Sequence, residues 1–292
     1  KPVGYPRGGC VTIPSTFLKG AERHGAALRL SAGVRKINIV KGRVGGVTLN
    51  DGKEITARAV ISTTNVRDTV EKLTGPQFFP AEYVQRVRKI KSSWTAVQAK
   101  IGVKKKLVDA GVLVGGVPLK LPGGALTDED TRKFINQLDS GDFPDVLPIY
   151  APVPSNYDPA LAPEGCQLLT AVACAPTLDV PLKQGEQAWI DGMMNALYAM
   201  LPELRDNIIF CDTWTVNTLA SWIGKSNGSA ITTAQTPDQV AFKRPPHETP
   251  IKGLYLAGDC AGPAHGVGTE LACQSGVDCG DLVSSHIYNH VI

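Results

Sequence analysis

The sequence lacks long hydrophobic runs. No stretch approaches the roughly 18 consecutive apolar residues that a membrane-spanning helix needs. The first residues also lack the apolar centre of a signal peptide, and they do not include a methionine. We therefore expect a cytoplasmic chain without a spanning helix, and we interpret its start as that of a fragment or a cleaved product.

A large excess of charge is also missing, and aromatic residues are few. The formal net charge is +3, and aromatic residues make up 6% of the chain. A charge this small gives no general attraction for nucleic acid, so no nucleic-acid partner is expected. Any basic partner surface has to be local.

Paired cysteine motifs are absent as well. The seven cysteines are an odd number and include no Cys-x-x-Cys pair, which argues against a disulfide framework or a zinc site. We expect reduced, mostly buried thiols in a cytoplasmic protein. His286 and His290 either bind one metal ion or lie in a frayed, solvated helix end; we expect the second, and no metal site.

The most informative stretch lies near the end of the chain. Residues 253–259 are a short apolar run closed by Gly258 and Asp259, which predicts a buried strand that places a carboxylate at its carboxyl end, where open α/β sheets bind ligands. Asp259 only accepts hydrogen bonds, so the hydroxyl groups of a sugar or ribityl chain would suit it. The alternative is a structural N-cap or turn residue.

A helix is predicted after this strand, over residues 269–284. Its first backbone N–H groups have no partner within the helix and attract negative charge. Ala272, Gly276 and Gly280 recur at every fourth position, although each interior glycine costs about 1 kcal/mol relative to alanine. We therefore expect another part of the protein, or a ligand, to pass close to this side of the helix.

The N-terminal quarter predicts a turn, a helix and hairpins. Two adjacent glycines follow Pro6, and a helix is expected over 13–24, with Pro14 in its first turn. Short alternating segments between 25 and 57, separated by Lys-Gly and Asp-Gly turns, predict consecutive hairpins. Residues 59–63 are an apolar run and predict a central parallel strand.

The middle of the chain has a different composition. Helices are predicted over 66–73, 78–90 and 186–201, and strands over 145–155, over 168–174 and from 208. In the helix over 186–201, Met193 and Met194 are interpreted as core residues.

A basic stretch begins within the predicted helix 78–90, and an apolar, loop-like segment over 112–121 follows it, before the predicted strand 145–155. The stretch is either a solvated face or a patch that rests on anionic lipid, which would allow peripheral membrane contact. Its eight residues are Arg86, Arg88, Lys89, Lys91, Lys100, Lys104, Lys105 and Lys106.

The strand and helix around Asp259 resemble the C-terminal FAD-binding motif of the flavin-dependent amine oxidase and phytoene desaturase superfamily. In that family a strand ending in Ala-Gly-Asp precedes a glycine-containing helix start. The resemblance implies that Asp259 binds the ribityl or pyrophosphate part of FAD and that backbone amides at the helix start face the flavin. The implied cofactor residues are Gly258, Asp259, Gly266, Val267, Gly268, Thr269 and Glu270.

The N-terminal part is similar to the phytoene desaturase-like and retinol saturase-like flavoproteins of the same superfamily. A Pro-x-Gly-Gly turn, a helix, a Gly-x-Val hairpin and an Ala-x-Val-Ile-Ser strand occur in the same order. The resemblance implies that the backbone at Val34 contacts the adenine of FAD. It also implies that the turn formed by Pro6, Arg7, Gly8 and Gly9 lies near the flavin ring.

The family's N-terminal Gly-x-Gly-x-x-Gly unit is not found in this sequence. After Gly266 and Gly268, Leu271 stands where a third small residue is required. The resemblance therefore implies an α/β fold: a partial Rossmann-like FAD domain, residues 1–66 and 250–292, with a mixed-sheet α+β substrate domain, residues 67–249. The missing unit would come from the N-terminal half of the same enzyme or from a separate subunit.

The resemblance implies a flavin-dependent oxidoreductase that moves a hydride between FAD and an apolar substrate, such as an isoprenoid. The flavin carries that chemistry, so no catalytic side chain is assigned. The alternatives are an amine-oxidase-type enzyme and a non-catalytic subunit that completes a partner's flavin pocket. His265 in the glycine loop either takes part in the chemistry or hydrogen-bonds the backbone.

Overall fold

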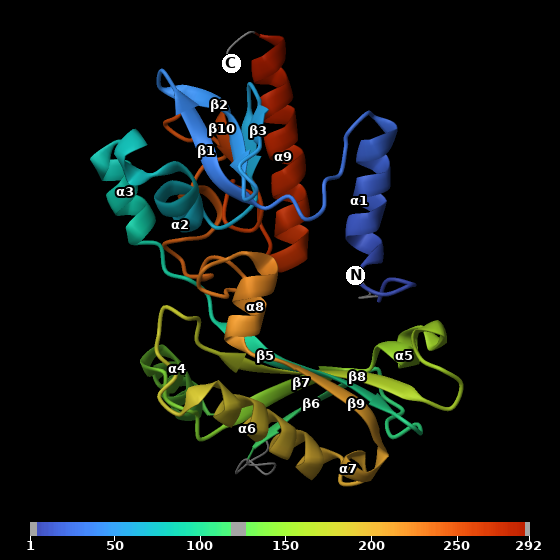
Figure 1. Cartoon of the computed structure of the whole chain (residues 1–292). Helices are drawn as coiled ribbons and strands as arrows, with labels where there is room; N and C mark the ends of the chain where they lie inside the picture. The colour runs from blue at the N-terminus through green and yellow to red at the C-terminus, as the bar shows by residue number, and fades with distance from the viewer. Residues whose placement is uncertain (1–4, 118–126, 290–292) are drawn as a thin grey trace. The chain divides into compact units, whose positions relative to one another are not determined.

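The computed structural model divides into two compact units, each a mixture of helices and strands (Figure 1). The structure describes residues 5–117 and 127–289. Unit 1 comprises residues 1–28 and 94–219, and unit 2 comprises residues 29–93 and 220–292. The predicted mixed α/β class is confirmed.

The boundaries of the two compact units differ from the predicted domain boundaries. Residues 67–93 and 220–249, assigned from the sequence to a substrate domain, group with the C-terminal part of the chain in unit 2. The predicted domain boundaries, 1–66 with 250–292 and 67–249, stay predictions.

Unit 1 is built on a five-stranded antiparallel sheet in the order β6-β7-β8-β5-β9. Its strands are β5 (Thr95–Val103), β6 (Val112–Val117), β7 (Leu147–Pro152), β8 (Gln167–Ala175) and β9 (Ile208–Trp214). Its helices are α1 (Thr12–Arg23), α4 (Asp128–Ser140), α5 (Pro154–Tyr157), α6 (Gly185–Met200) and α7 (Leu204–Asn207). Helix α8 (Val216–Ile223) continues from unit 1 into unit 2.

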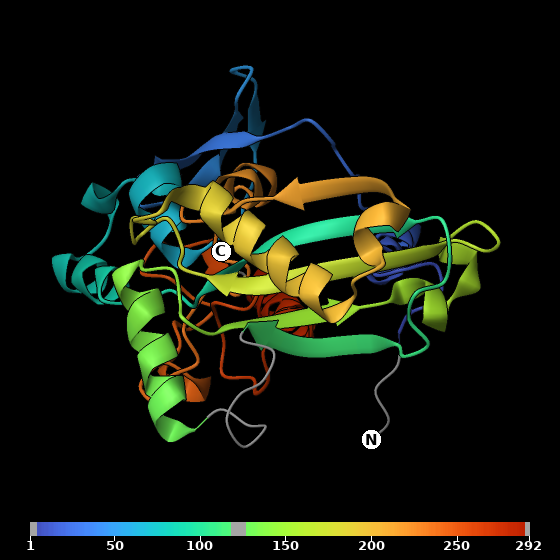
Figure 2. The same cartoon turned by 90° about the horizontal axis from the view of Figure 1, so that it is seen from below.

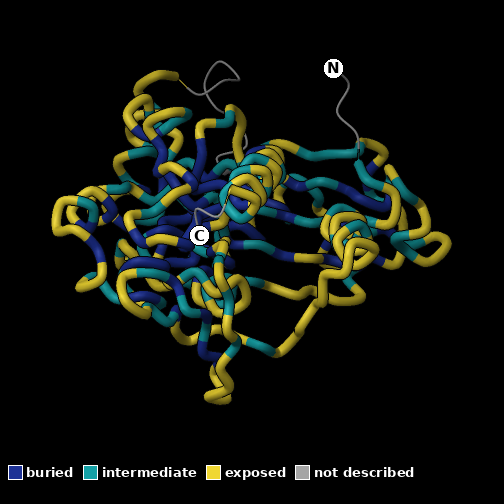
Figure 3. The backbone as a smooth tube through the Cα atoms, turned by 90° about the horizontal axis from the view of Figure 1, so that it is seen from above, coloured by how far each residue is buried: buried dark blue, intermediate teal, exposed yellow. Residues whose placement is uncertain are grey.

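The core of unit 1 lies between this sheet and α6, which crosses one face of it (Figure 2). Along β8, buried and half-buried residues alternate, as expected for a sheet that is covered on one side. Trp189, Met193 and Leu197 of α6 are buried against that covered side. Figure 3 colours the backbone by burial, with the buried parts in dark blue and the exposed parts in yellow. The interpretation of Met193 as a core residue is confirmed.

One prediction for unit 1 is wrong. The segment 112–121 was expected to be loop-like, but Val112–Val117 forms strand β6 and pairs with β7 along its whole length. Its glycines allow this close pairing: a Cβ at Gly116 would lie 2.7 Å from the carbonyl oxygen of Leu147. Residues 118–121 lie outside the described part of the chain.

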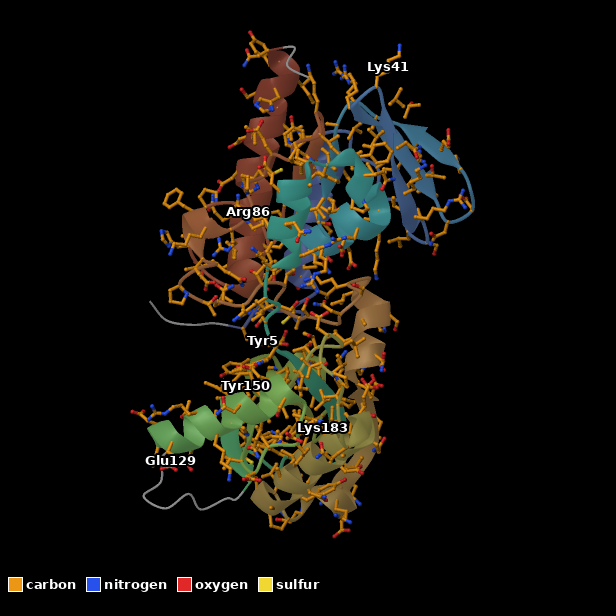
Figure 4. The ribbon with its side chains drawn as sticks, turned by 90° about the vertical axis from the view of Figure 1, so that its left-hand side faces the viewer. Tyr5, Lys41, Arg86, Glu129, Tyr150 and Lys183 are labelled. Atoms are coloured by element: carbon orange, nitrogen blue, oxygen red, sulfur yellow. The ribbon has the colours of Figure 1, made fainter. Side chains whose placement is uncertain are left out.

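Unit 2 contains two small sheets. Strands β1 (Val34–Val40), β2 (Arg43–Leu49) and β3 (Glu54–Thr56) form an antiparallel sheet, and β4 (Val60–Ser62) pairs in parallel with β10 (Leu254–Leu256). Lys41 stands at the tip of the β1–β2 hairpin (Figure 4). The predicted hairpins are confirmed, except that residues 26–30 form no strand. The parallel pairing of the predicted strand 59–63 is also confirmed, but its central position is not, since within the described residues β4 pairs only with β10.

The helices of unit 2 are α2 (Val66–Asp68), α3 (Ala81–Arg88) and α9 (Gly268–Tyr288), and α2 runs into a π-helical turn, Thr69–Thr74. Both helices predicted between residues 66 and 90 are therefore confirmed. The predicted C-terminal helix is longer than expected and ends at Tyr288.

Helix α9 buries a different face from the one expected. Leu271, Ser275 and Cys279 are buried, whereas Gly276 is exposed. A Cβ at Gly276 or Gly280 would meet no atom of the described residues within 4 Å. The expected close neighbour is therefore not another described part of this chain, because the buried face lies one position before the glycines. A ligand or a further segment on this side stays a prediction.

The expected burial of the thiols is also wrong. Only Cys260 and Cys279 are buried, and Cys10 and Cys211 are exposed. His286 is not a frayed end residue, since its Nδ1 lies 2.7 Å from the hydroxyl of Tyr255. No metal-binding cluster occurs among the described residues, which do not include His290.

The basic stretch is divided between the units. Arg86 lies on α3 in unit 2 (Figure 4), and Lys100 and the three lysines after it lie in unit 1. Ion pairs bind Lys105 to Glu203 and Lys106 to Asp109. The membrane contact stays a prediction. Among the helices that the structure describes, none is long and apolar enough to cross a bilayer.

Two neighbouring positions on α9 test this orientation. We expect Gly276→Ala to raise the free energy of unfolding by up to about 1 kcal/mol, because the methyl group enters open space and alanine favours the helix. Ser275→Ala should lower it by about 1–3 kcal/mol, because two buried hydrogen bonds are lost. Urea unfolding of both variants measures this, and loss of stability in Gly276→Ala would show that its side of the helix is covered.

Candidate functional site

The candidate site is built at the carboxyl end of β10. The strand is buried along its length and pairs with β4 in parallel. Gly253 precedes it with a φ of 83°, and a Cβ there would lie 2.6 Å from the carbonyl oxygen of Arg58, so only glycine fits this approach. The prediction of a buried strand that leads to Asp259 is confirmed.

Asp259 is 8% exposed, and its carboxylate is held by a loop that no sequence motif linked to it. It accepts hydrogen bonds from the backbone N–H of Thr232 at 2.9 Å and from the Thr232 hydroxyl at 2.6 Å. The ammonium group of Lys225 lies 3.7 Å from it and donates to the same hydroxyl. A carboxylate has about four acceptor positions, so these contacts leave capacity for a ligand hydroxyl.

A second buried carboxylate holds the same loop. Asp68 accepts hydrogen bonds from the backbone N–H and the hydroxyl of Ser226, at 2.9 and 2.6 Å. The side chain of Asn65 also donates to it. The loop is thus fixed at both ends in the same way. At one end Ser226, and at the other Thr232, donates hydrogen bonds from its backbone N–H and its hydroxyl to one carboxylate.

The loop after Asp259 is fixed by α9. The hydroxyl of Ser275 accepts from the N–H of Gly258 and donates to the carbonyl of Ala261, both at 3.0 Å. Burial raises the pKa of the Cys260 thiol to about 12, so this cysteine is neutral near pH 7 and is not a nucleophile. The two hydrogen bonds of Ser275 thus tie the first part of this loop to α9.

Helix α9 begins without a side-chain cap. Its N-cap residue is Val267, which has no side chain that can accept a hydrogen bond. Gly266 and Gly268 have φ values of 112° and 60°, conformations that favour glycine. The N–H groups of Gly268, Thr269 and Glu270 are therefore available to an acceptor. Asp259 is not the N-cap of α9, so that part of the alternative is wrong. Asp259 does lie in a turn, so a structural turn residue stays the alternative to a ligand contact.

A shallow groove of about 620 Å³ runs beside the start of α9. It is lined by Glu270 and Cys273 of the helix, by His265 of the glycine loop, and by Phe242. His265 is exposed there, so its side chain is accessible from this groove.

The other predicted cofactor residues lie elsewhere. Val34 opens β1 in the three-stranded sheet of unit 2, and its side chain is exposed. Pro6, Arg7, Gly8 and Gly9 form the expected turn, but they belong to unit 1. In that turn the N–H of Gly8 donates to the carboxylate of Asp158 at 2.7 Å, a contact that sequence reasoning missed.

Comparison with known proteins supports the same assignment. A family model described as flavin containing amine oxidoreductase matches residues 1–283. The chain belongs to this family, and it is similar to phytoene desaturase-like members of it. A flavin family of this kind indicates FAD as the cofactor, as the sequence predicted.

The similar proteins are longer than this chain. Pyridine nucleotide-disulfide oxidoreductase domain-containing protein 2 of Rattus norvegicus is 26% identical over 90% of this chain and 48% of its own length. Chloroplastic prolycopene isomerase of Daucus carota is 24% identical over 98% of this chain and 45% of its own length. An oxidoreductase of Methanosarcina mazei has the same fold, with a TM-score of 0.66 and 19% sequence identity. The match covers 94% of this chain and 55% of that protein. The chain spans about half the length of these relatives.

The residues at the end of β10 fit part of an FAD site. Asp259 is an acceptor with unused capacity, and uncapped N–H groups follow it at the start of α9. The carboxylate suits ribityl hydroxyls, and the N–H groups suit an electron-rich or anionic group.

The contact between Thr232 and Asp259 can be tested in the chain itself. Thr232→Val keeps the shape of the side chain and removes the hydroxyl, so we expect a loss of about 1–2 kcal/mol in the free energy of unfolding. Adding Asp259→Asn should give a combined loss that differs from the sum of the single losses, because the residues interact. Thr16→Val, in which the lost hydroxyl is exposed, is the control. A double variant whose loss in the free energy of unfolding equals the sum of the two single losses would contradict the contact between Thr232 and Asp259.

Proposed function

We propose that this chain supplies part of the FAD site of an oxidoreductase that moves a hydride between FAD and an apolar substrate. The observation that carries the proposal is the uncapped start of α9, which follows the acceptor Asp259 in a chain of the flavin containing amine oxidoreductase family. FAD, when bound, supplies the redox chemistry. The residues of this chain bind and orient it.

The proposed roles follow from the donors and acceptors present. Asp259 accepts from cofactor hydroxyls, and the N–H groups of Gly268, Thr269 and Glu270 donate to the electron-rich edge of the ring system. Gly258, Gly266 and Val267 shape the backbone between them. Val34 and the turn from Pro6 to Gly9 are proposed to contact the adenine and the ring, as the family resemblance implies.

We further propose that the site is completed by a segment that carries the Gly-x-Gly-x-x-Gly unit, in the same polypeptide or in another. Two features of unit 2 support a docking surface for it. Within the described residues β4 pairs only with β10, and Ile61 in its middle is 41% exposed. An exposed strand edge pairs readily with a further strand. Gly276 and Gly280 also leave one side of α9 open to a close neighbour.

The proposed apolar substrate is supported by the less covered face of the unit 1 sheet. Val114, Tyr150 and Val172 form a row across β6, β7 and β8. Val114 is 75% exposed and Tyr150 is 55% exposed. A contiguous apolar surface of this kind suits an apolar ligand, and the relative named prolycopene isomerase favours an isoprenoid.

Flavin retention tests the cofactor role. The chain is purified alone and together with a co-expressed N-terminal half, and bound flavin is measured by absorbance. We expect flavin to be retained only in the assembly. Flavin on the chain alone would contradict the need for a second segment, and an assembly that forms without flavin would favour a non-catalytic scaffold.

Gly276→Leu tests the docking surface in the same assay. The chain alone should tolerate leucine, since the position is open, whereas the assembly should be weakened by about 1–3 kcal/mol if a segment packs there. Asp281→Leu, on an exposed position of the same helix, is the control. Equal assembly of the Gly276 variant and the wild type would remove this surface from the proposal.

Asp259→Ala tests the proposed ligand contact. On the complete assembly we expect flavin binding to weaken by about 1.5–3 kcal/mol, the range for a hydrogen bond to a charged group. Thr232→Val keeps the carboxylate and should weaken binding less. Unchanged flavin affinity in Asp259→Ala would take this residue out of the cofactor site.

A further inference from the structure

Arg244 is a buried cation close to the candidate site, and no sequence motif pointed to it. Its side chain is 3% exposed. One nitrogen of the guanidinium group, Nη1, donates to the carbonyl of Gly262 at 3.0 Å and to the carbonyl of Ala264 at 2.7 Å. Its Nε has no hydrogen-bond partner among the described residues. Burying a charge is costly unless the structure uses it, so this arginine needs an explanation.

The two carbonyls lie in the loop that leads to the start of α9. The same loop is fixed from the other direction, because the N–H of Gly262 donates to the carbonyl of Pro245 at 2.9 Å. The ring of His247 packs against Gly262, where a Cβ would come within 2.4 Å of it. His247 is itself held to the carbonyl of Leu256 in β10. The segment from Arg244 to His247 therefore clamps the loop onto the end of the strand.

Two cations, Lys225 and Arg244, and one carboxylate, Asp259, lie near the start of this loop. Burial lowers the pKa of Arg244, and the charge of Asp259 opposes this shift. Lys225 forms the ion pair with Asp259, whereas the guanidinium group of Arg244 donates to two backbone carbonyls. Among the described residues, the buried charge of Arg244 is therefore held by carbonyl oxygens and not by a carboxylate.

We infer that Arg244 is a positioning residue of the FAD site, which fixes the loop before α9 and supplies a buried positive charge beside it. The inference rests on the proposed function. By holding the carbonyls of Gly262 and Ala264, Arg244 sets where the N–H groups of Gly268 to Glu270 are presented. Reduction makes a flavin more negative, and a buried cation favours the more negative state.

Two substitutions separate the two effects. Arg244→Gln removes the charge and keeps a short amide donor. Arg244→Lys keeps the charge but replaces the planar fork with a single ammonium group. Arg205→Gln in unit 1 is the control, since that arginine is exposed and stacks on Tyr198. A merely structural role would lower stability in the Arg244 variants without changing the flavin potential.

The experiment uses the complete assembly and has two readouts. The first is hydrogen exchange at the Gly262 amide, measured without added flavin; we expect exchange to be about tenfold faster in Arg244→Gln, which corresponds to about 1.4 kcal/mol. The second is the flavin midpoint potential, which should fall in Arg244→Gln and be retained in Arg244→Lys. The control should match the wild type in both.

Each outcome decides the inference. A Gln variant with wild-type exchange at Gly262 would overturn the positioning role. A Gln variant with the wild-type potential would overturn the electrostatic role. If Arg244→Gln does not fold, the Lys variant decides, since wild-type exchange at Gly262 in that variant would overturn the positioning role. A wild-type assembly that binds no flavin would instead contradict the proposed function, and the exchange result would still decide whether Arg244 fixes the loop.

Discussion

The candidate site depends on one buried carboxylate. Asp259 lies where β10 ends, and Thr232 and Lys225 bind it from a loop that is distant in the sequence. Because a buried charge without partners costs several kcal/mol, these contacts hold the loop and the strand end in one arrangement. Ser275 and Arg244 then fix the backbone that follows. The uncapped start of α9 consequently follows a segment that is held by several hydrogen bonds to other parts of unit 2.

Under the proposed function, the role of this framework is to hold the cofactor, and no side chain of this chain is assigned a catalytic role. Flavin chemistry needs a cofactor held in one orientation, and backbone N–H groups and one carboxylate are sufficient contacts from this part of the protein. The buried, neutral thiol of Cys260 supplies no competing nucleophile. Unit 1 adds a half-covered sheet, whose apolar row offers a surface of the kind that the proposed substrate needs.

Much of this was accessible from the sequence, because its signals are local. The apolar triplet of β10, the turn residues of the β1–β2 hairpin and the spacing of Met193 with its neighbours depend on periods of two or about 3.6 residues. The partners of Asp259 were not accessible. Thr232 is 27 positions away, and a buried hydroxyl leaves no periodic pattern. The face that α9 buries within this chain was not accessible either, because it is set by tertiary packing and not by the position of Gly276.

The most direct test of the central claim is hydrogen exchange at the amides of Gly268, Thr269 and Glu270 in the complete assembly, measured with and without FAD. The account predicts slower exchange at these three amides when FAD is bound, since they gain an acceptor that the helix does not provide. Amides near Tyr288, at the far end of α9, should be unchanged. Protection at Tyr288 and none at Gly268 to Glu270 would contradict the account.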